Sequence, residues 1–120
     1  MRLDPRPLTD HERSVLDRVL SSEFDGVLEL RDQARDVQVV GRCDCGCPSV
    51  DLRANPNRPK AQATGRLAPV ELQVRPRADE PPGNIILFLD DGQLSYLEYV
   101  YYTDSPPPSW PTADRLRNLT

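Results

Sequence analysis

The residues of this chain with the clearest capacity for chemistry are three cysteines at alternate positions of one short stretch, GRCDCGCPSVDL: Cys43, Cys45 and Cys47. Thiolate sulfur is a preferred ligand of zinc and of monovalent copper, and a structural zinc site takes four ligands in a tetrahedron. Only three sulfurs are present. A metal site would therefore need a further ligand, for which His11, Asp44 and Asp51 are the candidates.

The spacing of the cysteines favours packing over metal binding. On an extended strand alternate side chains point to opposite faces, so Cys43 and Cys47 should lie on one side and Cys45 on the other. Common zinc modules carry separated C-x₂₋₄-C pairs, which this chain lacks. We therefore predict that the cysteines pack in a hairpin, with a zinc or copper(I) site and a redox-active thiol as the two alternatives. Three sulfurs within about 4 Å of a common point would favour the ion.

Nucleophilic catalysis by these cysteines is not expected. A reactive cysteine needs a lowered pKa and a base within reach. Arg42 should point away on a strand, and Asp44 between two thiols would raise their pKa. No glycine-rich phosphate loop and no GxSxG motif occurs. We predict a non-enzymatic protein with no catalytic residue and no cofactor other than the alternative metal.

Composition and charge exclude several classes of partner. The net charge of −4 and the pI near 4.9 disfavour binding to nucleic acid. No apolar run reaches the ~20 residues that cross a bilayer, and the first residues lack the apolar core of a secretory signal. We therefore predict a cytoplasmic protein without membrane contact, in which the thiols stay reduced.

Two helices are predicted near the N-terminus. Thr9 and Glu12 form a capping-box pattern, which predicts a helix from Asp10 to about Ser21. A second, shorter helix is predicted over 25–35, with Asp25 as its N-cap. Residues 1–8 are expected to be an extended lead-in because they are rich in proline.

Strands are predicted after the helices. β-Branched and alternating apolar residues indicate strands over 37–43, 49–53 and 67–74, followed by a proline-rich loop over 75–83. Two β-prone runs flank Asp91-Gly92, a dipeptide typical of a tight hairpin turn. We predict one α+β domain over 1–120, with two N-terminal helices packed on a mostly antiparallel sheet of about five strands. Residues 105–120 should form a proline-rich tail with a short terminal helical turn.

The late strand and the tail contain the aromatic residues of a candidate interface. Tyr99 and Tyr101 share one face of the predicted strand, and Trp110 would join them if the tail folds back. Tyrosine and tryptophan anchor many protein interfaces, although half-buried tyrosine is also ordinary in sheets. We predict a protein-interaction module with an unknown protein partner, in the manner of small immunity proteins that neutralise a toxin. The oligomeric state is not predicted.

Two stretches resemble a set of small bacterial proteins that is frequent among high-GC bacteria. These stretches are VVGRCDCGCPSVDL and LFLDDGQLSYLEYV, which match an RCxCGCPS hairpin and a DGxLxxLE strand pair. In that set a helix opening like LTDHERSVLDRVL precedes the hairpin, and a proline-containing tail ends the chain. The resemblance covers most of the chain and implies the same order of elements, but it implies no catalytic or ligand residue.

Overall fold

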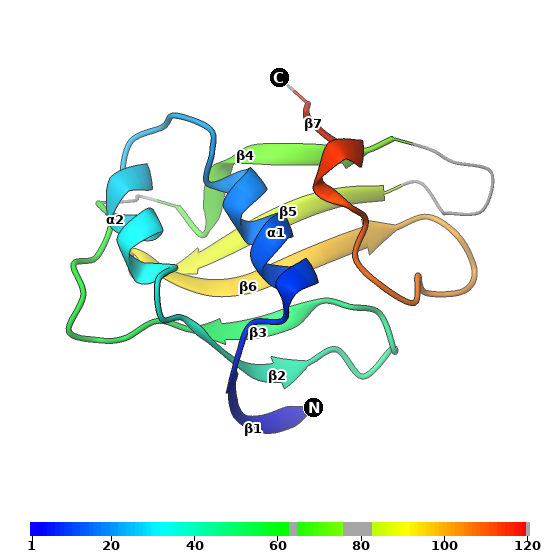
Figure 1. Cartoon of the computed structure of the whole chain (residues 1–120), viewed down its shortest axis with the longest axis horizontal. Helices are drawn as coiled ribbons and strands as arrows, with labels where there is room; N and C mark the ends of the chain where they lie inside the picture. The colour runs from blue at the N-terminus through cyan, green and yellow to red at the C-terminus, as the bar shows by residue number, and fades with distance from the viewer. Residues whose placement is uncertain (63–64, 76–82, 120) are drawn as a thin grey trace.

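One antiparallel sheet dominates the computed structural model, which describes residues 1–62, 65–75 and 83–119 (Figure 1). Within these residues the sheet has seven strands in the order β1-β2-β3-β6-β5-β4-β7. The strands are β1 (Arg2–Pro7), β2 (Gln38–Arg42), β3 (Val50–Arg53), β4 (Leu67–Val74), β5 (Gly83–Asp90), β6 (Gln93–Tyr101) and β7 (Leu116–Asn118).

The predicted α+β architecture, with two helices on a five-stranded sheet, is wrong because the chain is mostly sheet. The two α-helices are short, with ten residues in α1 (Asp10–Val19) and seven in α2 (Val27–Gln33). The extra strands β1 and β7 are the two sheet edges, where a lead-in and a tail were predicted. Strand β1 was not predicted because it contains Pro5 and Pro7. Proline usually breaks a strand, but it is tolerated at the edge of a sheet.

The five predicted strands are confirmed as β2 to β6. The hairpin turn between β5 and β6 is confirmed as well: Asp91 has φ 50° and Gly92 has φ 74°, the positive values that a tight hairpin turn requires. Most of the proline-rich loop predicted over 75–83 lies outside the described residues.

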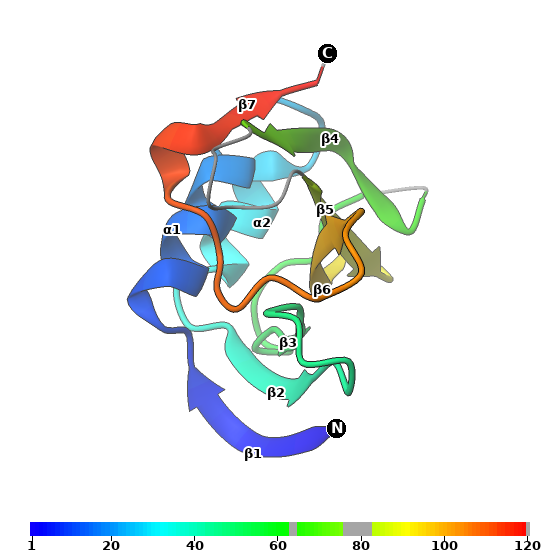
Figure 2. The ribbon, with the colours of Figure 1, turned by 90° about the vertical axis from the view of Figure 1, so that its right-hand side faces the viewer.

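Both helices cover the same face of the sheet (Figure 2). Helix α2 packs on β6, and α1 packs on β4 and on the 3₁₀-helix η1 (Ala113–Arg115) of the C-terminal segment. The buried apolar side chains of the helices are Val15, Leu16, Val19, Val27 and Leu30, and those of the central strands include Leu72, Ile85, Leu87 and Leu97. No helix in the described part of the chain is both long enough and apolar enough to span a bilayer.

A buried amide joins helix α2 to the β5–β6 turn. The side chain of Gln33 donates hydrogen bonds from Nε2 to the carbonyl oxygens of Pro59 (2.9 Å) and Gly92 (3.0 Å). Its Oε1 accepts a hydrogen bond from the backbone N–H of Leu94 at 2.9 Å. Because each polar atom of this side chain is paired, the amide is accommodated in the core and holds the turn against the helix.

The start of α1 is held by a buried carboxylate. The predicted capping box is confirmed: the N–H of Glu12 donates to Thr9 Oγ1 (3.2 Å), and the N–H of Thr9 donates to Glu12 Oε1 (2.9 Å). Arg6 of β1 donates to both carboxylate oxygens, at 2.8 and 3.0 Å. Burial alone would raise the pKa of Glu12, but the bonds from Arg6 and Thr9 hold that pKa below its usual value. At the second helix the predicted N-cap is wrong, since Gly26 occupies that position.

Replacing this carboxylate should make stability less dependent on pH. We expect Glu12→Gln to lower the free energy of unfolding by roughly 1–2 kcal/mol at neutral pH, through loss of the ion pair and weakening of the cap. The folded-state pKa lies below the unfolded one, so this stabilisation is present above the unfolded pKa and is lost as the pH falls through the folded pKa. Urea denaturation of both proteins at neutral and acidic pH measures the difference. An equal difference at both pH values would contradict the assignment.

Candidate metal centre

The three cysteines lie in a loop of residues 43–49 that joins β2 to β3. The strand pairing ends at Arg42 opposite Val50, and the N–H of Cys43 donates to the carbonyl oxygen of Ser49 at 3.3 Å. Gly46 has φ +90°, a value that side chains with a Cβ rarely adopt. The glycine therefore lets the backbone reverse direction between Cys45 and Cys47.

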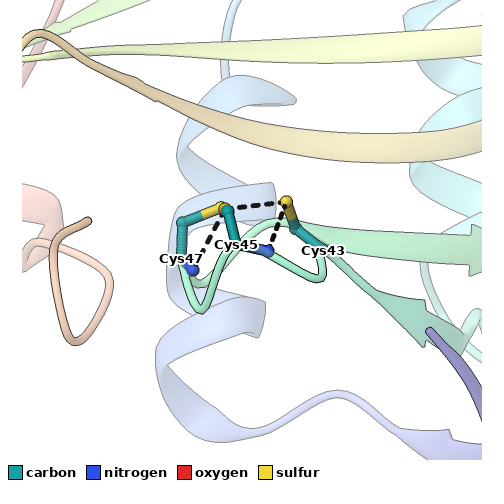
Figure 3. Close-up of side chains that lie close together, drawn as sticks. All are labelled: Cys43, Cys45 and Cys47. Carbon is teal, nitrogen blue, oxygen red and sulfur yellow. Dashed lines mark hydrogen bonds between the residues drawn. The ribbon is translucent and has the colours of Figure 1, made fainter. Parts of the chain in front are cut away.

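The sulfurs converge instead of alternating across a strand (Figure 3). The ligand atoms of all three cysteines lie within 4.8 Å of one another. The prediction that Cys45 points away from the other two is wrong, because residues 43–49 are not extended and strand parity does not apply to them. The cluster runs from the surface inward: Cys45 is exposed, Cys43 is half-buried and Cys47 is buried.

The size of the cluster suits a metal ion. Three sulfurs no more than 4.8 Å apart have a common centre at most about 2.8 Å from each. A metal bonded to three sulfurs at about 2.3 Å would hold them roughly 3.8–4.0 Å apart. The sulfurs of Cys43 and Cys45 are 2.8 Å apart. Binding would therefore move these two sulfurs apart by about 1 Å, within a surface loop.

Hydrogen bonds shift the pKa values of Cys45 and Cys43 in opposite directions. Bonds from the side chains of Cys43 and Cys47, and from the backbone N–H of Cys47 at 3.3 Å, lower the pKa of Cys45 to about 7. The thiol of Cys43, hydrogen-bonded to Cys45, has its pKa raised to about 11. The N–H of Cys45 also donates to the sulfur of Cys43 at 3.4 Å. Such N–H···S bonds stabilise negative charge on sulfur, as the outer shell of a metal–thiolate site does.

Strand β6 supplies several of the groups that contact the loop. The hydroxyl of Tyr101 is hydrogen-bonded to Cys45, which lowers the pKa of that thiol and raises the pKa of the tyrosine. Ser49 is buried, and its Oγ accepts the N–H of Tyr99 at 2.9 Å, so it fixes the end of the loop to β6. Burial raises the pKa of Tyr96 to about 12, while its hydrogen bond to Ser49 opposes the shift. Sequence reasoning missed Ser49 and Tyr96, although Ser49 lies only two residues after Cys47.

No fourth side-chain ligand is found for the three sulfurs among the His, Cys, Asp and Glu residues that the structure describes. The carboxylate of Asp44 lies 2.8 Å from the Met1 amino group and is largely exposed. His11 lies in the first turn of α1, where it lines a cavity of about 260 Å³ together with Arg42 and Pro48. Asp51 belongs to β3 and is likewise absent from the cluster.

The aromatic residues of the predicted interface are divided between the core and the cysteine loop. Tyr99 and Trp110 are buried and stack on each other, with ring centroids 5.9 Å apart. These two residues therefore do not form the exposed surface that a docking interface requires, because the C-terminal segment folds back and places Trp110 in the core. Tyr101 is half-buried beside Cys45. Partner binding through these three residues stays a prediction.

Comparison with protein-family models, with curated proteins and with solved structures finds no match to this chain.

Proposed function

We propose that the chain binds one monovalent copper ion through the sulfurs of Cys43, Cys45 and Cys47, as a trigonal thiolate site. The observation that carries this proposal is the convergence of three sulfurs without a fourth His, Cys, Asp or Glu ligand among the described residues. Copper(I) is a soft ion that thiolates select. Tetrahedral zinc, in contrast, would have to complete its shell with a water or an external ligand.

The loop also supplies what a charged thiolate site needs. Two backbone N–H groups, those of Cys45 and Cys47, point at cysteine sulfurs, and the hydroxyl of Tyr101 adds a third donor. These donors offset the negative charge that builds up when three thiols lose their protons. Metal binding would replace the hydrogen bond between Cys43 and Cys45 with two metal–sulfur bonds.

The position of the site supports reversible metal exchange over a structural role. Cys45 is exposed, so an ion on it stays within reach of an external thiol ligand. The main cluster of core side chains, which lies between the sheet and the helices, contains none of the three cysteines, although Cys47 is buried. The fold therefore does not need the ion, and the protein acts by carrying, storing or sensing copper.

Elemental analysis and competition titration test the proposal. The protein is purified under reducing, oxygen-free conditions without chelator and titrated with copper(I) held by a coloured competing ligand. We expect the protein to bind about one equivalent of copper(I). It should bind zinc more weakly than copper(I). The variant with all three cysteines changed to serine is the control and should bind none. Less than about a tenth of an equivalent of either metal in the parent protein would refute the site.

A further inference from the structure

Two of the three sulfurs are already close to bonding distance. The sulfurs of Cys43 and Cys45 are 2.8 Å apart, and a disulfide bond is about 2.0 Å long. Both residues lie in the same surface loop, so no strand of the sheet has to separate for the sulfurs to close the gap (Figure 3). The pair is thus placed for a reaction that metal binding does not use.

We propose that Cys45 is a thiol that reacts with hydroperoxides and that Cys43 resolves the product to a Cys43–Cys45 disulfide. In the first step the thiolate sulfur of Cys45 attacks one oxygen of the hydroperoxide and the O–O bond breaks. Cys45 becomes a sulfenic acid, and the second oxygen leaves and takes up a proton, giving water or an alcohol. In the second step the sulfur of Cys43 attacks the sulfur of Cys45, the S–O bond breaks, and hydroxide leaves with the proton of Cys43 as water. The peroxide gains the two electrons that the two cysteines lose.

Exposure and the position of its sulfur select Cys45 as the attacking residue. It is the one exposed residue of the three, so a peroxide in solution reaches it first. Its sulfur also accepts the backbone N–H of Cys47 at 3.3 Å, which holds it beside the sulfur of Cys43. Cys43 is the resolving residue because of its 2.8 Å separation, whereas Cys47 is buried.

Oxidation would also control the metal site. A disulfide removes two of the three sulfurs from coordination, so a bound ion would be released. This consequence rests on the proposed copper site, whereas the disulfide itself forms in metal-free protein. The two proposals are therefore tested separately.

The experiment treats reduced, metal-free protein with hydrogen peroxide, blocks the remaining thiols with N-ethylmaleimide and measures the intact mass. We expect the protein to lose about 2 Da through disulfide formation and to carry one blocked thiol in place of three. Dithiothreitol should restore all three. A parent protein that keeps three reactive thiols after peroxide treatment would overturn the proposal.

Two variants assign the roles. Cys47→Ala keeps a small apolar side chain at the buried position, and it should still form the Cys43–Cys45 disulfide, because neither of those sulfurs is removed, while losing copper affinity. Cys43→Ala should stop at the sulfenic acid, which dimedone traps. If Cys43→Ala still closes a disulfide with Cys47 at the parent rate, Cys43 is not the resolving residue. Disulfide formation without copper binding in the parent would refute the metal site alone, and the reverse result would refute the redox pair alone.

Discussion

Cys45→Ala is expected to weaken copper(I) binding roughly a hundredfold or more, because each ligand of a thiolate site contributes about 3 kcal/mol to the binding free energy. Cys45 is the middle member of the cluster: its sulfur accepts a hydrogen bond from the thiol of Cys43, and it also receives hydrogen bonds from Cys47 and Tyr101. Without Cys45, only the sulfurs of Cys43 and Cys47 remain, and the sulfur that contacts both of them is lost. Competition titration against a coloured copper(I) ligand measures the change.

Asp44→Asn is the matched control for this substitution. Asp44 lies in the same loop and directly precedes Cys45, but its carboxylate contacts the Met1 amino group instead of the sulfurs. We expect its copper affinity to stay within about threefold of the parent value, since an exposed ion pair contributes little. Equal losses for Asp44→Asn and Cys45→Ala would show that general loop disturbance, and not sulfur ligation, governs binding.

The interior of the sheet could be predicted because alternation is a local signal. In β5 the buried residues Ile85, Leu87 and Leu89 occupy every second position, as a strand with one core face requires. The turn residues Asp91 and Gly92 add the backbone preference that joins β5 to β6. The edge strands carry no such signal, because β1 contains proline and β7 spans three residues.

The cysteine cluster could not be predicted because strand parity holds only while the backbone is extended. Pairing between β2 and β3 ends at Arg42 and Val50, which leaves a loop of residues 43–49. Within this loop Gly46 turns the chain back, and the position of each sulfur depends on that turn. The sequence shows which residues are present, but the convergence is a property of the loop conformation.

The error over Trp110 has a related cause. A segment rich in proline indicates an extended connection, but it does not say whether that connection crosses solvent or the core. Here it returns to α1, where η1 packs, and Trp110 is buried against Tyr99. Trp110 therefore contributes to the stability of the core, whereas its position after several prolines suggested a docking surface.

Gly92→Ala is expected to lower the free energy of unfolding by at least about 3 kcal/mol, from backbone strain and overpacking together. Gly92 has φ +74°, and a Cβ at this position would lie 2.1 Å from the carbonyl oxygen of Ala61. That backbone cannot retreat freely, because the N–H of Ala61 donates to the carbonyl oxygen of Gly92 at 2.9 Å and Gln33 donates to the same oxygen. The added methyl group thus strains the turn and forces apart two backbone segments that are bonded to each other.

Gly65→Ala separates this effect from a general cost of replacing glycine. The nearest heavy atom to a Cβ at Gly65 is the backbone nitrogen of Leu67 at 4.0 Å, an ordinary contact. We expect a change within about 0.5 kcal/mol for this variant in urea denaturation. Strand β6 begins after the turn that contains Gly92, and it carries Tyr101 to the cysteine loop. Gly92→Ala should therefore also weaken copper binding under conditions where part of the protein is unfolded. Similar stability of the two alanine variants would mean that the segment at Ala61 moves aside without cost, and that the close approach at the turn does not constrain the fold.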